Sequence, residues 1–582
     1  MKSDFKEIIA SQIDFGNSKF SLLMKKVVLR IITRILYLNR VEKFLKTNSH
    51  LEEKQFINQL FDDLNFSYFI SSRDQQKIPA QGRLICVANH PIGSLDALSL
   101  LKAFLEIRRD VKIVANEVLY SIEPLRDLLI PIKLDSTTAQ KNSIIAIQQA
   151  LQSECAVIMF PAATVSRLSG LTIVDSKWHK GSIRFASRFN SSVLPVHIEA
   201  RNSIFFYALS VVSKKFSTML LVHELFNKKN QSIKIRIGDV IPSKAFSSPV
   251  IDNDYQTKLL KKHVYQIGKG KKGIYTTEKN IIHPIDRKLL KTELNNSQFL
   301  GITRDNMKIY LTTRSESPQT INEIARLREL TFRKVGEGTG KNHDLDKFDH
   351  YYSHLVVWDD TELEIIGSYR IGNGNQIMST LGQEGFYTST LFKYSPDFKE
   401  KYLSNSIELG RSFVQNRYWN TNALSYLWQG IGTYLQSDPT IKYMFGGVSI
   451  SNTYPPATKE MIVYYFNKWF GDREGLAESK RQYSVSERQS IKYQNIFNSG
   501  TAKDDYKILK KMLKPYGFTI PVLYKHYSDL CEPGGIRFLD FGTDPDFENC
   551  IDGLILVEVD LIKEEKKQKF IGSVISNLKA TG

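Results

Sequence analysis

Between residues 51 and 265, short apolar runs alternate with segments that have helical spacing. The apolar runs predict buried strands at 84–88, 111–120, 128–135, 156–160, 193–200 and 232–241. The pattern at 141–152 and a basic segment near 181–188 predict helices between those strands. Strands separated by helices favour an α/β domain with a mainly parallel sheet.

A second set of elements begins after residue 305. Apolar runs predict strands at 307–313, 363–374, 407–415 and 442–451, and helical spacing predicts helices at 321–336 and 421–436. The fold class is therefore α/β with two domains. The segment between them is basic and contains Gly-Lys-Gly-Lys-Lys-Gly at 268–273. We expect a helical segment at 1–50, one domain at 51–265, a solvated linker at 266–304 and a second domain at 305–582.

Residues 19–46 contain no glycine or proline and place apolar side chains at helical spacing, interrupted by lysines and arginines. Such a helix can lie in the headgroup region of a membrane with its cations toward anionic lipid. It can equally pack its apolar face on its own domain. No window holds 18 uninterrupted apolar residues, so we expect no membrane-spanning helix.

The chain is strongly basic, with a net charge of +18 over 582 residues. This balance suits an anionic membrane surface or an acidic protein partner. Nucleic-acid-binding signatures are missing, so no nucleic acid is expected as a partner. The four cysteines lie far apart without metal-ligand spacing, which indicates reduced thiols of a cytoplasmic protein. We expect neither a metal nor a bound cofactor.

The strand at 84–88 stops at Asn89-His90-Pro91, and Asp96 follows six residues after His90 at the start of a helix. A turn through Gly93 can bring the Asp96 carboxylate back to the imidazole. A histidine held in one tautomer in this way can take a proton from a hydroxyl. The alternative is a plain turn followed by a helix cap.

This segment resembles the histidine and aspartate motif of the glycerolipid (lysophospholipid) acyltransferase superfamily, in a variant with five residues between the two. The resemblance implies that His90 is the catalytic base and Asp96 its orienting partner, with Asn89 and Gly93 in the substrate site. The superfamily's second motif matches Phe160, Pro161, Thr164 and Arg167. Its glutamate and glycine are missing here, and FPAATVSR is more similar to a branch that reads FPAGEVSR. That departure disfavours a glycerol phosphate acceptor, and a plain loop at the strand end is the alternative.

The second domain resembles the GNAT-like acyltransferases, in the branch of acyl-homoserine-lactone synthases and ornithine-lipid N-acyltransferases. The resemblance includes matches at Phe386-Tyr387 and from Phe547 to Asp552. The candidate site residues that carry it are Arg328, Asp346, Asp349, Arg370 and the Glu408-Leu409-Gly410-Arg411 run. It implies a catalytic role for Glu408, as acceptor of an amine proton, and for Arg411, and a substrate-binding role for the other four. On a regular strand Glu408 and Arg411 face opposite sides, so sharing a site requires a bulge. The alternatives are an internal ion pair between Glu408 and Arg411 and a salt network of the other four on a lid.

One domain made to acylate a hydroxyl and one made to acylate an amine suggest a bifunctional synthase of an ornithine-type aminolipid. In this interpretation residues 305–582 transfer a 3-hydroxyacyl group from acyl carrier protein to an amino acid. Residues 51–265 then esterify the 3-hydroxyl of the lyso-aminolipid. The expected partners are acyl carrier protein as co-substrate and the cytoplasmic face of the membrane, where the protein is peripheral. The alternatives are an N-acyltransferase whose first domain only docks on the membrane, and a non-enzymatic basic tether.

Overall fold

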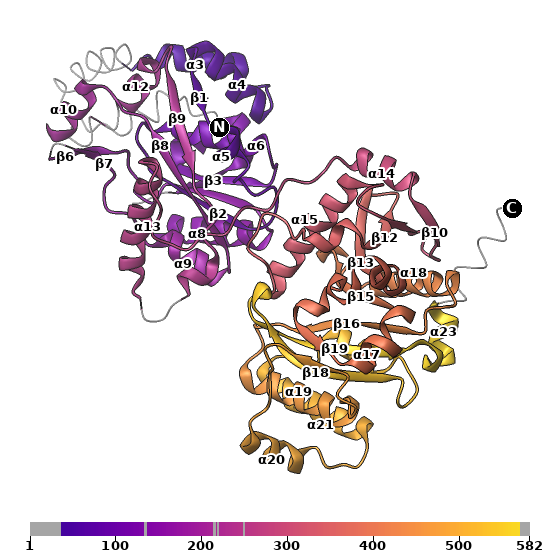
Figure 1. Cartoon of the computed structure of the whole chain (residues 1–582). Coiled ribbons are helices and arrows are strands. Elements are labelled where there is room, and N and C mark those ends of the chain that lie inside the picture. Colours follow the sequence, from indigo (N-terminus) through magenta and orange to yellow (C-terminus); the bar gives the residue numbers. More distant parts are fainter. Residues whose placement is uncertain are drawn as a thin grey trace, which may run out of the picture. The chain divides into compact units, whose positions relative to one another are not determined.

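The computed structural model describes residues 36–570 except 121, 133–136, 171, 213–216, 218–219 and 248–250. The chain divides into two compact units, which meet between His283 and Pro284 in the sequence (Figure 1). Most of the helix predicted at 19–46 lies outside the described residues. Its described end overlaps helix α3, Leu38–Asn48.

The first unit is built on a seven-stranded sheet in which every neighbouring pair is parallel except β8 and β9. The predicted α/β fold with a mainly parallel sheet is confirmed. In spatial order the strands are β1 (Ser67–Phe69), β9 (Ser232–Ile237), β8 (Ser192–Glu199), β2 (Leu84–Ala88), β5 (Ala156–Met159), β3 (Val111–Asn116) and β4 (Leu129–Ile132).

Helices cover both faces of this sheet, so the central strands are buried on both sides. One apolar core includes residues of α4 (Glu53–Leu64) and α6 (Ser94–Leu105). The other includes residues of α8 (Thr137–Gln152), α9 (Gly181–Arg188) and α13 (Asn253–Gly268). Smaller elements are α5 (Ser72–Gln75), α7 (Glu117–Tyr120), β6 (Arg167–Ser169), β7 (Thr172–Val174), α10 (Ile204–Val212) and α12 (Leu221–Asn227).

The second unit is built on an eight-stranded, mostly antiparallel sheet. In spatial order its strands are β10 (Gln298–Ile302), β11 (Lys308–Thr312), β12 (Ser353–Asp359), β13 (Glu364–Asn373), β15 (Ser406–Val414), β16 (Tyr443–Ile450), β19 (Cys550–Glu558) and β18 (Ile536–Asp544). The parallel pair β15–β16 is joined at three positions, the last being Glu408 opposite Phe445. Beyond Glu408 the two strands no longer pair.

Helices of the second unit pack on both faces of its sheet. One core combines the sheet with α18 (Ala423–Ser437), α19 (Pro456–Phe470), α21 (Ala502–Leu513), α22 (Val522–Ser528) and α23 (Glu564–Phe570). A separate core holds α14 (Arg287–Asn295) and α15 (Pro318–Val335). The remaining elements are α16 (Gly374–Thr380), β14 (Phe392–Tyr394), α17 (Pro396–Lys401), β17 (Ala477–Ser479) and α20 (Glu487–Ile496). The strands β18 and β19 were not predicted, although both become part of the site below.

The segment predicted as a linker is divided between the two units. Its first part, after α13, packs back on the first unit, where the Ile274 N–H donates to Nδ1 of His263 over 2.8 Å. The Asn280 side chain donates to the carbonyl of Gln76 over 2.6 Å. Its later part forms α14 and β10 of the second unit. Among the described helices, none is both long and apolar enough to cross a bilayer.

Candidate active sites

His90 lies two residues after the end of the buried strand β2, and its imidazole meets the first turn of α6. Nδ1 of His90 lies 3.1 Å from Oδ2 of Asp96. That oxygen also accepts the N–H groups of Ile92 and Gly93 over 2.9 and 3.0 Å. Gly93 caps the helix at φ +95°, which a residue with a side chain rarely adopts. The loop therefore wraps around one carboxylate and fixes the imidazole beside it.

The two members of this pair differ in exposure. The His90 side chain keeps 18% of its surface exposed, whereas Asp96 is fully buried. Burial raises the pKa of Asp96, and His90 and the two backbone N–H groups oppose that rise. In this arrangement the buried carboxylate fixes the orientation of the imidazole, and the accessible imidazole can act as a base.

The loop after β5 lies against His90, as the second motif requires. The Phe160 ring packs on the imidazole with 4.3 Å between centroids. The Ser166 N–H donates to the His90 carbonyl over 2.7 Å. Ala163 has φ +57°, the left-handed region that favours glycine. This backbone explains why glycine would suit that position in the similar FPAGEVSR sequence.

Asp175 joins these two loops, and sequence reasoning missed it. The side chain is 3% exposed and accepts Trp178 Nε1–H over 2.9 Å, the His90 N–H over 3.3 Å and the Ser166 hydroxyl. It sits in a short loop between β7 and α9, where an aspartate looks like an ordinary turn residue. The only signal in the sequence was an acid three residues before a tryptophan.

The other predicted substrate residues of the first unit have varied surroundings. Asn89 is buried and both ends of its amide bind the backbone of Ile198, over 2.7 and 2.9 Å, so it ties β2 to β8. The Pro161 carbonyl accepts the His179 N–H. Thr164 lies 3.3 Å from the Ser176 hydroxyl at the surface. The Arg167 guanidinium lies over the Phe206 ring, 5.8 Å from its centroid.

In the second unit, the Glu408 carboxylate binds the loop at 386–390. It accepts the N–H groups of Tyr387 and Thr388 over 2.9 and 2.7 Å, and hydroxyl donors from Thr388 and Tyr352. The side chain is 2% exposed. Burial and Glu408 together raise the pKa of Tyr352 well above its usual range, so that phenol stays protonated. With four donors on its two oxygens, Glu408 holds the loop against the end of the β15–β16 pairing.

Arg411 shares this site through a β-bulge. The register between β13 and β15 shifts between Ser368 and Arg370, and Arg411 has φ +51°. The condition set for Glu408 and Arg411 to share a site is therefore met. The two do not form an ion pair. The Arg411 guanidinium instead lies over the rings of Tyr387 and Phe547, at 4.7 and 4.0 Å.

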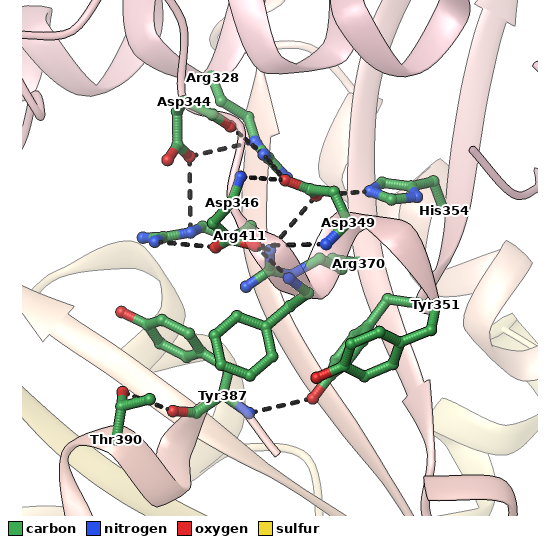
Figure 2. A network of polar contacts seen from close by, with 12 residues as sticks. Arg328, Asp344, Asp346, Asp349, Tyr351, His354, Arg370, Tyr387, Thr390 and Arg411 are labelled. Carbon is green, nitrogen blue, oxygen red and sulfur yellow. Dashed lines mark hydrogen bonds and ion pairs between the residues drawn. The ribbon is translucent and has the colours of Figure 1, made fainter. Parts of the chain in front are cut away.

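Three arginines and three aspartates meet beside Tyr387 (Figure 2). Arg328 binds Asp349 and Asp344 over 2.8 and 3.1 Å, and Arg370 binds Asp346 and Asp349 over 2.7 and 3.3 Å. Arg411 completes the network with contacts of 3.5 and 3.4 Å to Asp344 and Asp346.

The network is buried, so it holds the residues of the site in position and leaves substrate contacts to others. Arg328 and Asp349 are 0% exposed, which leaves no surface for a substrate. Burial alone would raise the pKa of Asp349, but Arg328 and Arg370 outweigh it and hold that pKa well below its usual range. Of the six residues, Arg411 and Asp346 reach furthest toward solvent, at 10% and 20% side-chain exposure.

Comparisons with known proteins agree with the division of the chain into two units. Residues 18–268 match a family model described as "Acyltransferase", and residues 327–429 match one described as "Acetyltransferase (GNAT) domain". A "Glycine N(alpha)-acyltransferase" of Bacteroides thetaiotaomicron is 35% identical over 309 residues, 51% of this chain and 91% of the relative. The chain belongs to the aminolipid acyltransferases. It is an enzyme that joins an acyltransferase domain to a GNAT domain in one polypeptide.

Other relatives match shorter parts of the chain. A "Lyso-glycine lipid O-acyltransferase" of Phocaeicola vulgatus is 27% identical over 229 residues, 38% of this chain and 81% of the relative. An "L-ornithine N(alpha)-acyltransferase" of Agrobacterium fabrum is 27% identical over 124 residues, 20% of this chain and 41% of the relative. Relatives named for O-acylation and for N-acylation thus each match part of this single chain.

Proposed function

We propose that this chain carries out two successive acyl transfers that build an aminolipid. The second unit acylates the α-amine of an amino acid with a 3-hydroxyacyl group, and the first unit esterifies the 3-hydroxyl of that product. The observation that carries the proposal is the presence of two separately built sites, His90–Asp96 and the Glu408–Arg411 bulge, in a chain whose halves resemble an O- and an N-acyltransferase.

For the ester step, His90 takes the proton from the acceptor hydroxyl while Asp96 holds the imidazole. The hydroxyl oxygen attacks the thioester carbonyl, and the thiol leaves with a proton returned by His90. Phe160 gives this site an apolar wall. An acceptor without a glycerol phosphate fits the FPAATVSR loop, which lacks the motif's glutamate.

For the amide step, the acyl thioester and the amine meet where β15 and β16 separate. Glu408 fixes the Tyr387–Thr388 loop there, and Arg411 supplies a fixed positive charge beside it. A cation in that place suits the amino-acid carboxylate. We propose acyl carrier protein as the thioester donor, since it is acidic and this chain carries a net charge of +18.

We propose glycine as the first amino acid to test and ornithine as the second. The support for glycine is a relative named as a glycine N-acyltransferase, which is 35% identical over 91% of its length. The relative named for ornithine is 27% identical over 41% of its length. We also propose that the protein works at the cytoplasmic face of a membrane, since its second substrate is a lyso-lipid.

Mass spectrometry tests the proposal on the purified full chain supplied with 3-hydroxyacyl and acyl carrier thioesters. Glycine and ornithine are offered separately, and the expected products are the N-acyl amino acid followed by its O-acylated form. Formation of the N-acyl product alone would favour an N-acyltransferase whose first unit only docks on the membrane. Absence of both products and of thiol release would contradict the proposal.

A further inference from the structure

The donors on Glu408 leave open which group receives the proton of the amine. Tyr352, Tyr387 and Thr388 already occupy both oxygens of that carboxylate. Cys550 lies on the same face of the sheet, but burial raises the pKa of its thiol far above neutrality. A different acceptor has to lie on this face, close to the point where the strands diverge.

Asp552 meets that requirement. It is 8% exposed, and among the described residues its one hydrogen-bond donor is the Cys550 thiol, with 3.8 Å between sulfur and oxygen. Buried carboxylates normally accept several N–H or O–H groups. Asp552 therefore has capacity for a donor that none of the described residues supplies.

The carboxyl of Asp552 points over Gly447 toward the Glu408 loop. A Cβ atom added to Gly447 would lie 3.9 Å from Cγ of Asp552 and 3.9 Å from Cγ2 of Thr388. The missing side chain thus leaves space between the acid and the loop. A Cβ on Gly410, on the facing part of β15, would meet nothing within 4 Å. The space lies where β15 and β16 have ceased to pair.

Other charged groups define what this space can bind. Asp544, on β18, accepts the Tyr387 hydroxyl over 3.0 Å. Glu337, just after α15, and Arg411, on β15, also act on the charge of Asp552. The groups that face Asp552 from the surrounding elements are Glu337, Tyr387, Arg411, Ser449, Tyr524, Asp544 and Cys550. A site with carboxylates on one side and one guanidinium on the other suits an amino-acid zwitterion.

We propose that Asp552 is the catalytic base of the amide-forming step, with Glu337 as the group that passes the proton to solvent. The inference deepens the proposed function and rests on it. The bound ammonium gives one proton to the Asp552 carboxylate, and the nitrogen lone pair forms the C–N bond to the thioester carbonyl. The C–S bond then breaks, and the sulfur leaves as a thiol with the second amine proton.

The electrostatics agree with this role. Burial, then Asp544 and Glu337, raise the pKa of Asp552 well above its usual range. Burial raises the pKa of Glu337 to about 7. Glu337 keeps part of its surface exposed, so it can exchange a proton with water. A general base works best when its pKa lies near the working pH.

The test compares Asp552→Asn with wild type in the full chain, measuring the amide product against pH. We expect kcat to fall by about 10²-fold or more, which is the usual size of a general-base contribution. The KM for the acyl thioester is expected to be unchanged. The matched control is Asp505→Asn, a buried aspartate of α21 held by Lys468 and Trp469. It is expected to keep the wild-type pH profile.

A second variant covers the case in which Asp552→Asn does not fold. Glu337→Gln removes a neighbouring negative charge, so the acid limb of the kcat/KM profile is expected to move to lower pH. If Asp552→Asn keeps the wild-type rate and pH profile, the inference is wrong while the proposed function stands. If Asp552→Asn is unfolded, an unchanged acid limb of the kcat/KM profile in Glu337→Gln has the same consequence. If the wild-type chain forms no amide, the proposed function fails and takes the inference with it.

Discussion

The imidazole of His90 is held 3.1 Å from the Asp96 carboxylate by a loop that turns the N–H groups of Ile92 and Gly93 toward that acid. Because Asp96 is fully buried and already accepts two backbone bonds, its position depends little on the imidazole. The carboxylate is a fixed support against which His90 is oriented. We therefore expect O-acylation by the first unit to depend on the Asp96 carboxylate.

Asp96→Asn tests this dependence. The variant keeps an oxygen for the Ile92 and Gly93 N–H groups but removes the charge that stabilises an imidazolium, so we expect the fold to persist. O-acylation should fall by about 10²–10⁴-fold, the range of a general-base contribution. The rate of the amide step should be unchanged. Mass spectrometry of both products from one reaction measures the two effects together, and equal losses in both would contradict the assignment.

Asp175→Asn tests the junction between the His90 loop and the Phe160 loop. The new amide nitrogen or oxygen cannot satisfy Trp178, Ser166 and the His90 N–H as the carboxylate does. We expect a loss of about 1–3 kcal/mol of unfolding free energy and slower O-acylation. Asp254→Asn, in an exposed pair with Lys180, is the control and should cost clearly less than Asp175→Asn. Denaturant titration compares the two.

Arg328→Met tests the buried network of the second unit. The change leaves Asp349 and Asp344 without one of their cations in a site that water does not reach. We expect a loss of about 3–5 kcal/mol, as is typical when one member of a buried ion pair is removed. Arg287→Ala removes an arginine whose side chain is 57% exposed where it pairs with Glu364, and it should change stability by less than about 1 kcal/mol. Similar losses in both variants would show that the network does not stabilise the unit.

Ala163→Gly tests the backbone of the FPAATVSR loop. At φ +57° glycine avoids the strain of a Cβ, so we expect a gain of about 0.5–1 kcal/mol. Ala146→Gly, inside helix α8, should lose about 1 kcal/mol. Thermal melting of both variants gives the sign of each effect. A loss in Ala163→Gly would mean that this turn is not strained.

Glu337 predicts a dependence of stability on pH. Its pKa is raised from 4.5 to about 7 in the folded chain, so between these values the folded state binds more protons than the unfolded state. Its contribution to the unfolding free energy therefore falls as pH rises from about 4.5 to about 7. Glu337→Gln should show a shallower fall. Denaturant titrations at several pH values measure the slope, and an unchanged slope would contradict the raised pKa.

Much of the fold followed from the pattern of apolar positions. The strands β2 and β5 are short, fully apolar runs and the centre of β8 is apolar, and a sheet buried on both faces produces that pattern. The resemblance to two acyltransferase families then led to His90, Asp96 and Arg411. Predicting that Glu408 and Arg411 need a bulge was possible because strand geometry fixes which residues share a face.

The rest depended on contacts between distant residues. Asp175 looks like a turn residue until the His90 loop lies against it, 85 positions away in the chain. Asp552 interrupts the apolar strand β19. Its neighbours Asp544 and Glu337 lie on other elements, and no pattern in the sequence predicts that these elements come together. Which carboxylate accepts four bonds and which accepts almost none is a property of packing.

The most direct test of two separate sites in one chain is His90→Ala in the purified full protein, supplied with amino acid and both acyl thioesters. Mass spectrometry should find the N-acyl amino acid formed at the wild-type rate and accumulating without its O-acylated form. Continued formation of the diacylated product, or loss of the N-acyl product as well, would contradict the account.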